Sequence, residues 1–153
     1  MRLQEAIKQK RFKSERHKAF LNIIWAHNLL TTWLEQRLKV EGLTMRQYNV
    51  LRILRGHYPE PMSMGDVKQR LLDRHSDLTR LISRLIDKGL VVRLDCPQDR
   101  RVVYVQITQS GLQLLSRLDV LENEIERHLG VLSEEEAAQL NALLDKICAA
   151  HEP

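Results

Sequence analysis

The sequence predicts a mainly α-helical protein that carries one small β-hairpin. Over most of the chain, leucine and isoleucine recur at three- and four-residue spacings, which is the pattern of amphipathic helices. The stretch GLVVRLDCPQDRRVVYVQIT, residues 89–108, differs, because two runs of alternating and β-branched residues flank a short turn. A chain of 153 residues without repeats or a glycine- and serine-rich linker is expected to form a single domain, 1–153.

The first helical segment is predicted over residues 3–40, as one long helix or as a broken pair. Between Phe20 and Leu34, apolar side chains point in nearly every direction around the helix axis. A helix that is apolar all round has to be covered on several sides. In a chain this small, a second subunit is the simplest cover.

The next helix is predicted to begin at about Thr44 and to end at the loop YPEPM, because proline lacks the backbone donor that a helix needs. Ser63 is a predicted N-cap, since its hydroxyl can accept a hydrogen bond from a first-turn amide. The short helix behind it is expected to contain Val67, Leu71 and Leu72.

After a turn near residues 72–76, the stretch DLTRLISRLIDKG predicts another helix, with a stripe of inward leucine and isoleucine. Gly89 is well placed as the C′ residue that closes this helix. The hairpin strands are then predicted at Leu90–Asp95 and Val102–Ile107.

The last third of the chain is predicted to be helical, with leucine and isoleucine at alternating three- and four-residue spacings from Ser110 onward. The stretch SEEE, residues 133–136, is a capping box that begins a further helix. The two segments 1–40 and 110–153 therefore suggest a helical bundle between subunits. Packing of three helices within one chain is the alternative.

The charge distribution suggests a polyanionic partner. The net charge is +4, with seven Lys and Arg against two Glu in residues 1–20 and nine against six Asp in residues 63–107. Residues 119–153 reverse the balance, with two basic against nine acidic side chains. Ordinary variation of surface charge is the alternative explanation.

Several classes of protein are disfavoured by the sequence. The N-terminus lacks the apolar stretch of a signal peptide, and the longest stretch without Asp, Glu, Lys or Arg has 16 residues, too few to span a membrane. We therefore expect no membrane partner and a cytoplasmic location. No catalytic pairing, phosphate-binding glycine loop or cofactor motif is found, so we expect neither an enzyme nor a bound cofactor. The six histidines form no short-spaced pair, so we expect no metal site.

A helix, a turn, a second helix and a basic hairpin together form a winged helix-turn-helix pattern, predicted for residues 41–109. Such a helix fits the major groove of duplex DNA, where its N-terminal residues meet the base edges. One turn further on, Arg84 is placed to reach a phosphate. The predicted base-reading residues are Arg74, His75, Ser76, Asp77, Thr79 and Arg80.

The hairpin turn projects Arg100 and Arg101, and arginine side chains on such an arm can enter a minor groove. Asp99 beside phosphates is unexpected unless it pairs with an arginine. Bidentate pairing of that kind would fix the direction of the arginine side chain.

Four stretches carry a resemblance to a known family: LTMRQYNVLRIL, LTRLISRLIDKGLVVRL, PQDRR at the hairpin turn, and VQITQSG before the next helix. With them, the chain resembles the MarR (multiple-antibiotic-resistance regulator) family of winged helix-turn-helix transcription factors. The resemblance implies a homodimer with interlocked terminal helices, two winged lobes on a pseudo-palindromic duplex, and usually repression relieved by a small molecule or an oxidant. By position it implies that Arg101 enters the minor groove with Asp99 as its orienting partner, and that residues 74–80 read bases.

The resemblance also implies an effector pocket between the dimer helices and the winged lobe. Trp25, His27, Trp33 and Tyr48 are candidates to line a pocket for a small aromatic or lipophilic effector, with ordinary core packing as the alternative. Oxidant-sensing relatives keep a cysteine near the start of the first long helix, and this chain has none there. Cys96, at the base of the wing, is either a redox-sensing thiol or a plain strand-end residue.

Two other functions stay open at this point. One is a winged-helix interaction module that does not bind DNA, and the other is a thiol-based redox-sensing regulator.

Overall fold

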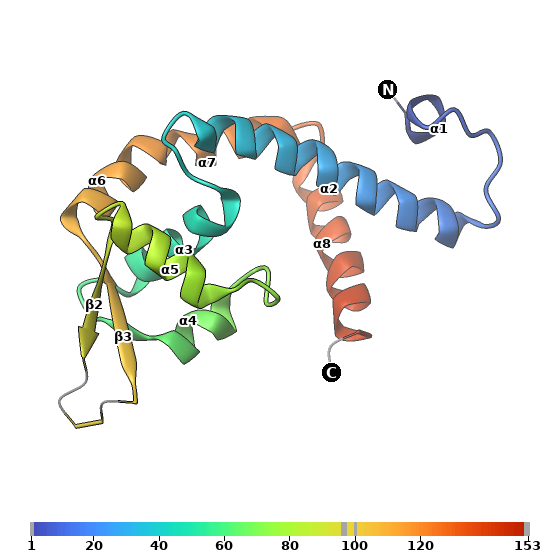
Figure 1. Ribbon diagram of the computed structural model, residues 1–153. Coiled ribbons are helices and arrows are strands. Elements are labelled where there is room, and N and C mark those ends of the chain that lie inside the picture. Colours follow the sequence, from blue (N-terminus) through green and yellow to red (C-terminus); the bar gives the residue numbers. More distant parts are fainter. Residues whose placement is uncertain (1, 96–97, 100, 152–153) are drawn as a thin grey trace. The chain divides into compact units, whose positions relative to one another are not determined.

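The computed structural model describes residues 2–95, 98–99 and 101–151. These residues form eight helices and three short strands, which confirms the predicted mainly helical fold with a hairpin (Figure 1). The chain divides into two compact units, residues 1–115 and 116–153. No described helix is long and apolar enough to cross a membrane.

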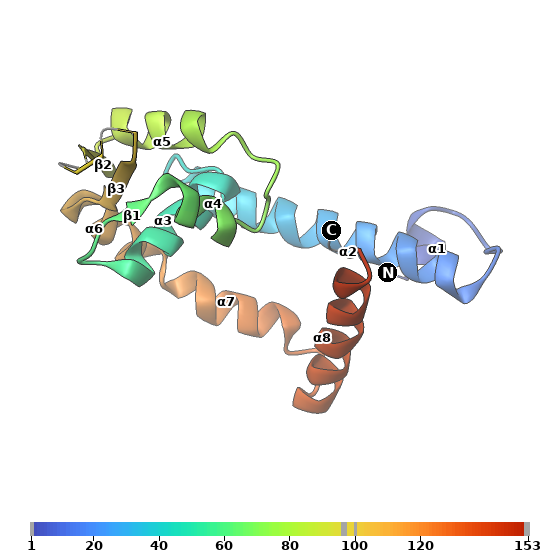
Figure 2. The ribbon, with the colours of Figure 1, turned by 90° about the horizontal axis from the view of Figure 1, so that it is seen from below.

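The N-terminal segment is a broken pair of helices, one of the two predicted forms. Helix α1 (Leu3–Ala6) is a single turn, and α2 (Glu15–Lys39) is long. Ser14 begins α2, because its hydroxyl accepts a hydrogen bond from the backbone N–H of His17 at 3.1 Å. Both views place α1 and the hairpin at opposite ends of α2 (Figures 1 and 2).

Three helices build the lobe next to the hairpin: α3 (Met45–His57), α4 (Met64–Arg70) and α5 (Leu78–Asp87). Each begins after a residue whose side chain accepts a first-turn backbone N–H, namely Thr44, Ser63 and Asp77. The predicted N-cap at Ser63 is confirmed.

The prediction that Leu71 and Leu72 belong to the helix behind Ser63 is wrong, because Leu71 is the extended C-cap residue of α4. Helix α4 ends at Arg70, and Leu72 is 86% exposed. The backbone N–H of Leu72 donates to Oδ1 of Asn49 on α3 at 3.1 Å. This side chain replaces the helical partner and turns the chain away from α4.

The sheet has three antiparallel strands in the order β1-β3-β2. Strands β2 (Val91–Asp95) and β3 (Val103–Ile107) pair along their full length, which confirms the predicted hairpin. Strand β1 (Met62–Ser63) pairs with β3 and was not predicted, because two residues beside a proline-containing loop carry no strand periodicity.

The core of the lobe lies between α3, α5 and the sheet. Side chains from these elements that are at most 2% exposed include Val50, Leu51, Leu54, Leu85 and Val105. Packing of these apolar side chains against one another fixes the position of α5 relative to the hairpin.

Gly89 connects α5 to β2 in the predicted C′ role. Its φ of +70° lies in the left-handed region that favours glycine. The backbone N–H of Gly89 donates to the Ile86 carbonyl at 2.8 Å, and that of Leu90 donates to the Leu85 carbonyl at 2.9 Å. These bonds satisfy the end of α5 and start the wing directly behind it.

Helix α6 (Gln109–Leu118) begins against the start of the hairpin. Thr108 donates from its hydroxyl to the Gly89 carbonyl and from its backbone to the Leu90 carbonyl. At Gly111, an added Cβ would lie 2.6 Å from both the Leu90 carbonyl oxygen and the Ile107 side chain, so only glycine fits.

The second unit contains α7 (Val120–Leu129) and α8 (Glu134–Ala149). The predicted capping box before α8 is confirmed by reciprocal bonds between Ser133 and Glu136, of 3.2 and 2.9 Å. The helix predicted to continue from Ser110 is interrupted at Asp119, where backbone bonds reach back three residues rather than four.

Both long terminal helices expose apolar side chains in the single chain. Among the described residues of α2, Leu38 is the one that is buried, and Phe20 is 60% exposed. The expectation of an all-round covered helix is therefore not met within one chain. The other large apolar residues exposed on these helices are Ile23, Ile24, Leu29 and Leu30 on α2, and Leu140, Leu143 and Ile147 on α8.

Candidate nucleic-acid interface

Helix α5 buries one face and exposes a basic one. Leu78, Ile82 and Leu85 are buried, so Arg80 and Arg84 lie on the side that faces solvent. The predicted stripe is therefore confirmed at these three positions, and Leu81 beside them is half-buried.

The other predicted base-reading residues lie at the beginning of α5. Arg74 and His75 belong to the turn before the helix, Asp77 is its N-cap, and Thr79 is in its first turn. All four are exposed. Ser76 differs, because it is 4% exposed and its side chain is enclosed within the turn.

The wing turn is shaped by Asp99. Its Oδ1 accepts a hydrogen bond from the backbone N–H of Arg101 at 2.9 Å, and its carbonyl accepts from Val102 at 3.1 Å. The observed partner of the Asp99 carboxylate is thus a backbone amide, where a guanidinium was expected, because a carboxylate two residues before an amide closes a tight turn. Both Asp99 and Arg101 are exposed.

Three residues of the wing that the sequence singled out lie outside the described residues: Cys96, Pro97 and Arg100. The predicted minor-groove contact of Arg100 and the redox role of Cys96 stay predictions.

The turn between α4 and α5, residues 71–77, is attached to α3 through Asp73. Nη2 of Arg46 lies 2.9 Å from Oδ2 of Asp73, and Oδ1 of Asp73 accepts from the backbone N–H of His75 at 3.1 Å. The Ser76 hydroxyl, the His75 amide and the Arg46 guanidinium together hold the pKa of Asp73 below its ordinary value. Asp73 therefore stays ionised under ordinary conditions.

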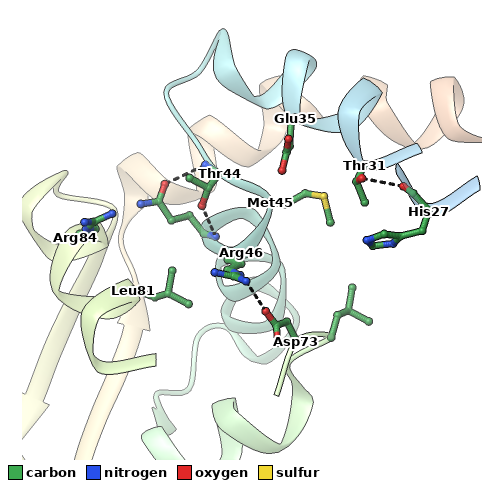
Figure 3. Close-up of a pocket in the computed structure, with 11 residues that line it drawn as sticks. His27, Thr31, Glu35, Thr44, Met45, Arg46, Asp73, Leu81 and Arg84 are labelled. Atoms are coloured by element: carbon green, nitrogen blue, oxygen red, sulfur yellow. Dashed lines mark hydrogen bonds and ion pairs between the residues drawn. The ribbon is translucent and has the colours of Figure 1, made fainter. Parts of the chain in front are cut away.

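A cleft of about 760 Å³ lies between α2 and the lobe (Figure 3). His27 faces it from α2, Arg46 and Asp73 meet within it, and Arg84 lines it from α5. The complete lining is His27, Thr31, Glu35, Thr44, Met45, Arg46, Gln47, Leu72, Asp73, Leu81 and Arg84.

Of the four aromatic and imidazole side chains proposed from the sequence, His27 alone lines this cleft. Trp25 and Trp33 are half-buried elsewhere on α2. Tyr48 is buried, and its hydroxyl accepts a hydrogen bond from Arg52 at 3.1 Å. Core packing, the alternative considered for these residues, describes Tyr48.

The charged residues of the cleft were not predicted from the sequence. Arg46 follows Thr44, whose capping box with Gln47 fixes the first turn of α3. The stretch TMRQ carries the T-x-x-Q signal of that box, so the position of Arg46 on the first turn was accessible. Its pairing with Asp73, 27 positions later, carried no local signal.

Within residues 2–95, 98–99 and 101–151, no group of three or more His, Cys, Asp or Glu side chains is placed to hold a metal ion.

Comparison with known proteins identifies the lobe. A MarR family model matches residues 41–102. The transcriptional regulator MhqR of Bacillus subtilis is 28% identical over 134 residues, which cover 85% of this chain and 89% of that protein.

Two solved structures extend the similarity to nearly the whole chain. The crystal structure of a MarR transcription factor from Planctomyces limnophilus is 37% identical, covers 88% of this chain and 98% of that chain, and has a TM-score of 0.68. A mutant of MarR from E. coli, solved in complex with operator DNA, is 26% identical, covers 90% and 99%, and has a TM-score of 0.77. Because a relative above 30% identity is covered almost completely, this chain belongs to the MarR family of DNA-binding transcriptional regulators.

Proposed function

We propose that this regulator acts as a homodimer that binds a pseudo-palindromic operator and represses transcription until a small molecule releases it. The observation that carries the proposal is the exposed, basic face of α5 directly beside the wing, on a lobe whose apolar core holds both in place. The E. coli relative of similar fold was solved on operator DNA, which supports the same partner here.

In this proposal the beginning of α5 enters the major groove. Arg74, His75, Asp77, Thr79 and Arg80 are exposed there and would meet base edges. In this proposal Ser76, which is buried, contributes to the shape of the turn and does not contact a base edge.

Two further contacts would anchor the lobe on the duplex. Arg84, one turn along α5, would reach a phosphate. Arg101 would enter the adjacent minor groove, together with Arg100, while Asp99 fixes the turn that presents them.

Dimerisation would occur through the terminal helices, residues 1–40 and 110–153. The exposed apolar side chains of α2 and α8 support this assignment, because such surfaces mark interaction sites on a soluble chain. Two-fold symmetry would then place the two recognition helices about one DNA turn apart.

The effector would bind in the cleft between α2 and the lobe. Met45, Leu72 and Leu81 offer an apolar wall, while Arg46 and His27 offer polar groups. This lining suits a small aromatic or lipophilic molecule that also carries a polar group. Screening such compounds by thermal shift would identify binders, since a ligand of the native state raises the unfolding temperature.

Selection from random duplexes, followed by gel shift, tests the proposal. We expect an enriched pseudo-palindrome whose half-sites are centred about 10 base pairs apart. If the purified protein retards no duplex even at low salt, the proposal is wrong and a winged-helix interaction module becomes the better description.

A further inference from the structure

We propose that Arg46 and Asp73 are positioning residues for DNA binding, whose ion pair holds the turn 71–77 and thereby orients the base-reading start of α5. The inference rests on the proposed function and assigns a role to two residues outside the proposed DNA contacts.

The turn 71–77 needs side chains to hold it, because it lies between two helices without a regular structure of its own. Three ties are present. Asn49 accepts from the Leu72 amide at 3.1 Å, Lys68 of α4 donates to the Ser76 carbonyl, and Arg46 pairs with Asp73 at 2.9 Å. Two of these three interactions, those of Asn49 and Arg46, therefore come from α3.

Asp73 connects α3 to the residues before α5, whereas Lys68 connects α4 to them through the Ser76 carbonyl. One carboxylate oxygen pairs with Arg46, and the other accepts from the His75 amide. His75 lies two residues before Asp77, the N-cap of α5. The carboxylate thus connects the first turn of α3 to the residues proposed to meet base edges.

The backbone at Arg46 is fixed by the capping box at the start of α3. Arg46 lies in the first turn of α3, where Thr44 and Gln47 bond reciprocally, and Gln47 is buried. A hollow of about 260 Å³ joins Arg46 to Asp77, Arg80 and Arg84. Figure 3 shows Arg46 between Asp73 and the side of α5 that carries Leu81 and Arg84.

The ion pair is exposed enough that its loss should leave the fold intact. The two side chains are 63% and 38% exposed, and exposed pairs contribute little to folding stability. A substitution here therefore acts on the orientation of the turn and only weakly on the core.

Electrostatics and positioning predict opposite outcomes at Asp73. If Asp73 is only a negative charge near DNA, its neutralisation reduces repulsion from phosphates and strengthens binding. If Asp73 orients the start of α5, its neutralisation misplaces base contacts and weakens binding to the operator.

The experiment compares the full-length protein and its variants on the selected operator and on a random duplex, by fluorescence anisotropy. We expect Asp73→Asn and Arg46→Ala to weaken operator binding about fivefold or more, the factor that one weakened base contact is worth. Binding to the random duplex should not weaken with Asp73→Asn. The double variant Arg46→Asp/Asp73→Arg, in which the ion pair is restored with reversed charges, should bind the operator more tightly than either single variant.

Asp87→Asn is the matched control, because Asp87 is an exposed acid at the other end of the same helix. It should leave operator binding unchanged or slightly stronger. Far-ultraviolet circular dichroism and the unfolding midpoint of each variant should match those of the wild type.

Three results would overturn the inference. Tighter operator binding by Asp73→Asn, as for Asp87→Asn, would make Asp73 a plain surface charge. A salt slope lowered by about one for Arg46→Ala would make Arg46 a direct phosphate contact. Unchanged operator binding in both variants would refute the positioning role but leave the proposed function intact. A wild-type chain that binds no duplex would refute the proposed function as well.

Discussion

Three neighbouring residues stabilise the negative charge of the Asp73 carboxylate. The Ser76 hydroxyl, the His75 amide and Arg46 all lower its pKa, against the opposing effect of desolvation. The pKa in the folded protein therefore lies below 3.8, the ordinary value. Because the folded pKa is depressed, this contribution to stability is present above about pH 4 and is lost as the pH falls through the folded value.

Ser76→Ala should raise the pKa of Asp73 toward its ordinary value, because the largest stabilising contact of the charged form is removed. Carbon-detected NMR of the carboxyl group over an acid titration measures this directly. Arg46→Ala should also raise the pKa of Asp73, because it removes a positive charge and a hydrogen bond from the carboxylate. An Asp73 pKa at or above 3.8 in the wild type would contradict the observed contacts.

Substitution of the exposed residues Arg101 and Arg84 should change DNA binding in two different ways. Arg101→Ala removes the proposed minor-groove contact and should weaken operator binding by about 1–3 kcal/mol. Arg84→Ala removes the proposed phosphate contact and should lower the salt slope by about one unit. Anisotropy titrations at several salt concentrations separate the two effects. If neither substitution changes affinity, the assigned docking of the lobe is wrong.

The ends of helices were predicted best from the sequence where a single residue fixes the local backbone conformation. Ser63 and the capping box at Ser133 begin helices as expected, and Gly89 closes α5 with a positive φ. Predictions failed where a distant contact decides the outcome. Leu72 leaves the helix because Asn49, 23 positions earlier, accepts its amide.

The proposed DNA-binding surface could be predicted from the local apolar periodicity of α5, whereas the cleft could not. The apolar stripe of α5 fixed which residues are buried and hence which arginines face outward. The cleft depends on how α2 lies against the lobe, which periodicity does not encode. Its charged pair, Arg46 and Asp73, was therefore missed. Of the candidates for an effector pocket, Trp25 and Trp33 do not line this cleft, and their role stays a prediction.

Two glycines should respond oppositely to alanine. Gly111→Ala should destabilise the fold by about 1–3 kcal/mol, because a Cβ there would meet the Leu90 carbonyl and the Ile107 side chain at 2.6 Å. Gly56→Ala should stabilise the fold by roughly 0.4–1 kcal/mol, since a Cβ added at this position meets no neighbouring atom within 4 Å and alanine favours the helix. Urea unfolding measures both, and equal effects would refute the close approach at α6.

At the scale of the whole molecule, the terminal helices expose more apolar surface than a lone chain needs. Phe20 and Ile24 on α2 are 60% and 43% exposed. We expect the wild type to sediment as a dimer, and the double substitution Phe20→Glu and Ile24→Glu to shift it toward monomer, because charge is costly in an apolar interface.

The control for this experiment is Val92→Glu, on the wing strand, where the side chain is 40% exposed. It should leave the sedimentation coefficient unchanged. A wild-type protein that sediments as a monomer at micromolar concentration would remove the proposed dimer.

In the proposed complex, two copies of α5 lie in successive major grooves while the wings reach the minor grooves beside them. Methylation interference on the selected operator tests this most directly, because dimethyl sulfate modifies guanine N7 in the major groove and adenine N3 in the minor groove. We expect guanine interference in two half-sites about 10 base pairs apart, with adenine interference next to each. Interference at adenine alone, or at a single unrepeated site, would contradict it.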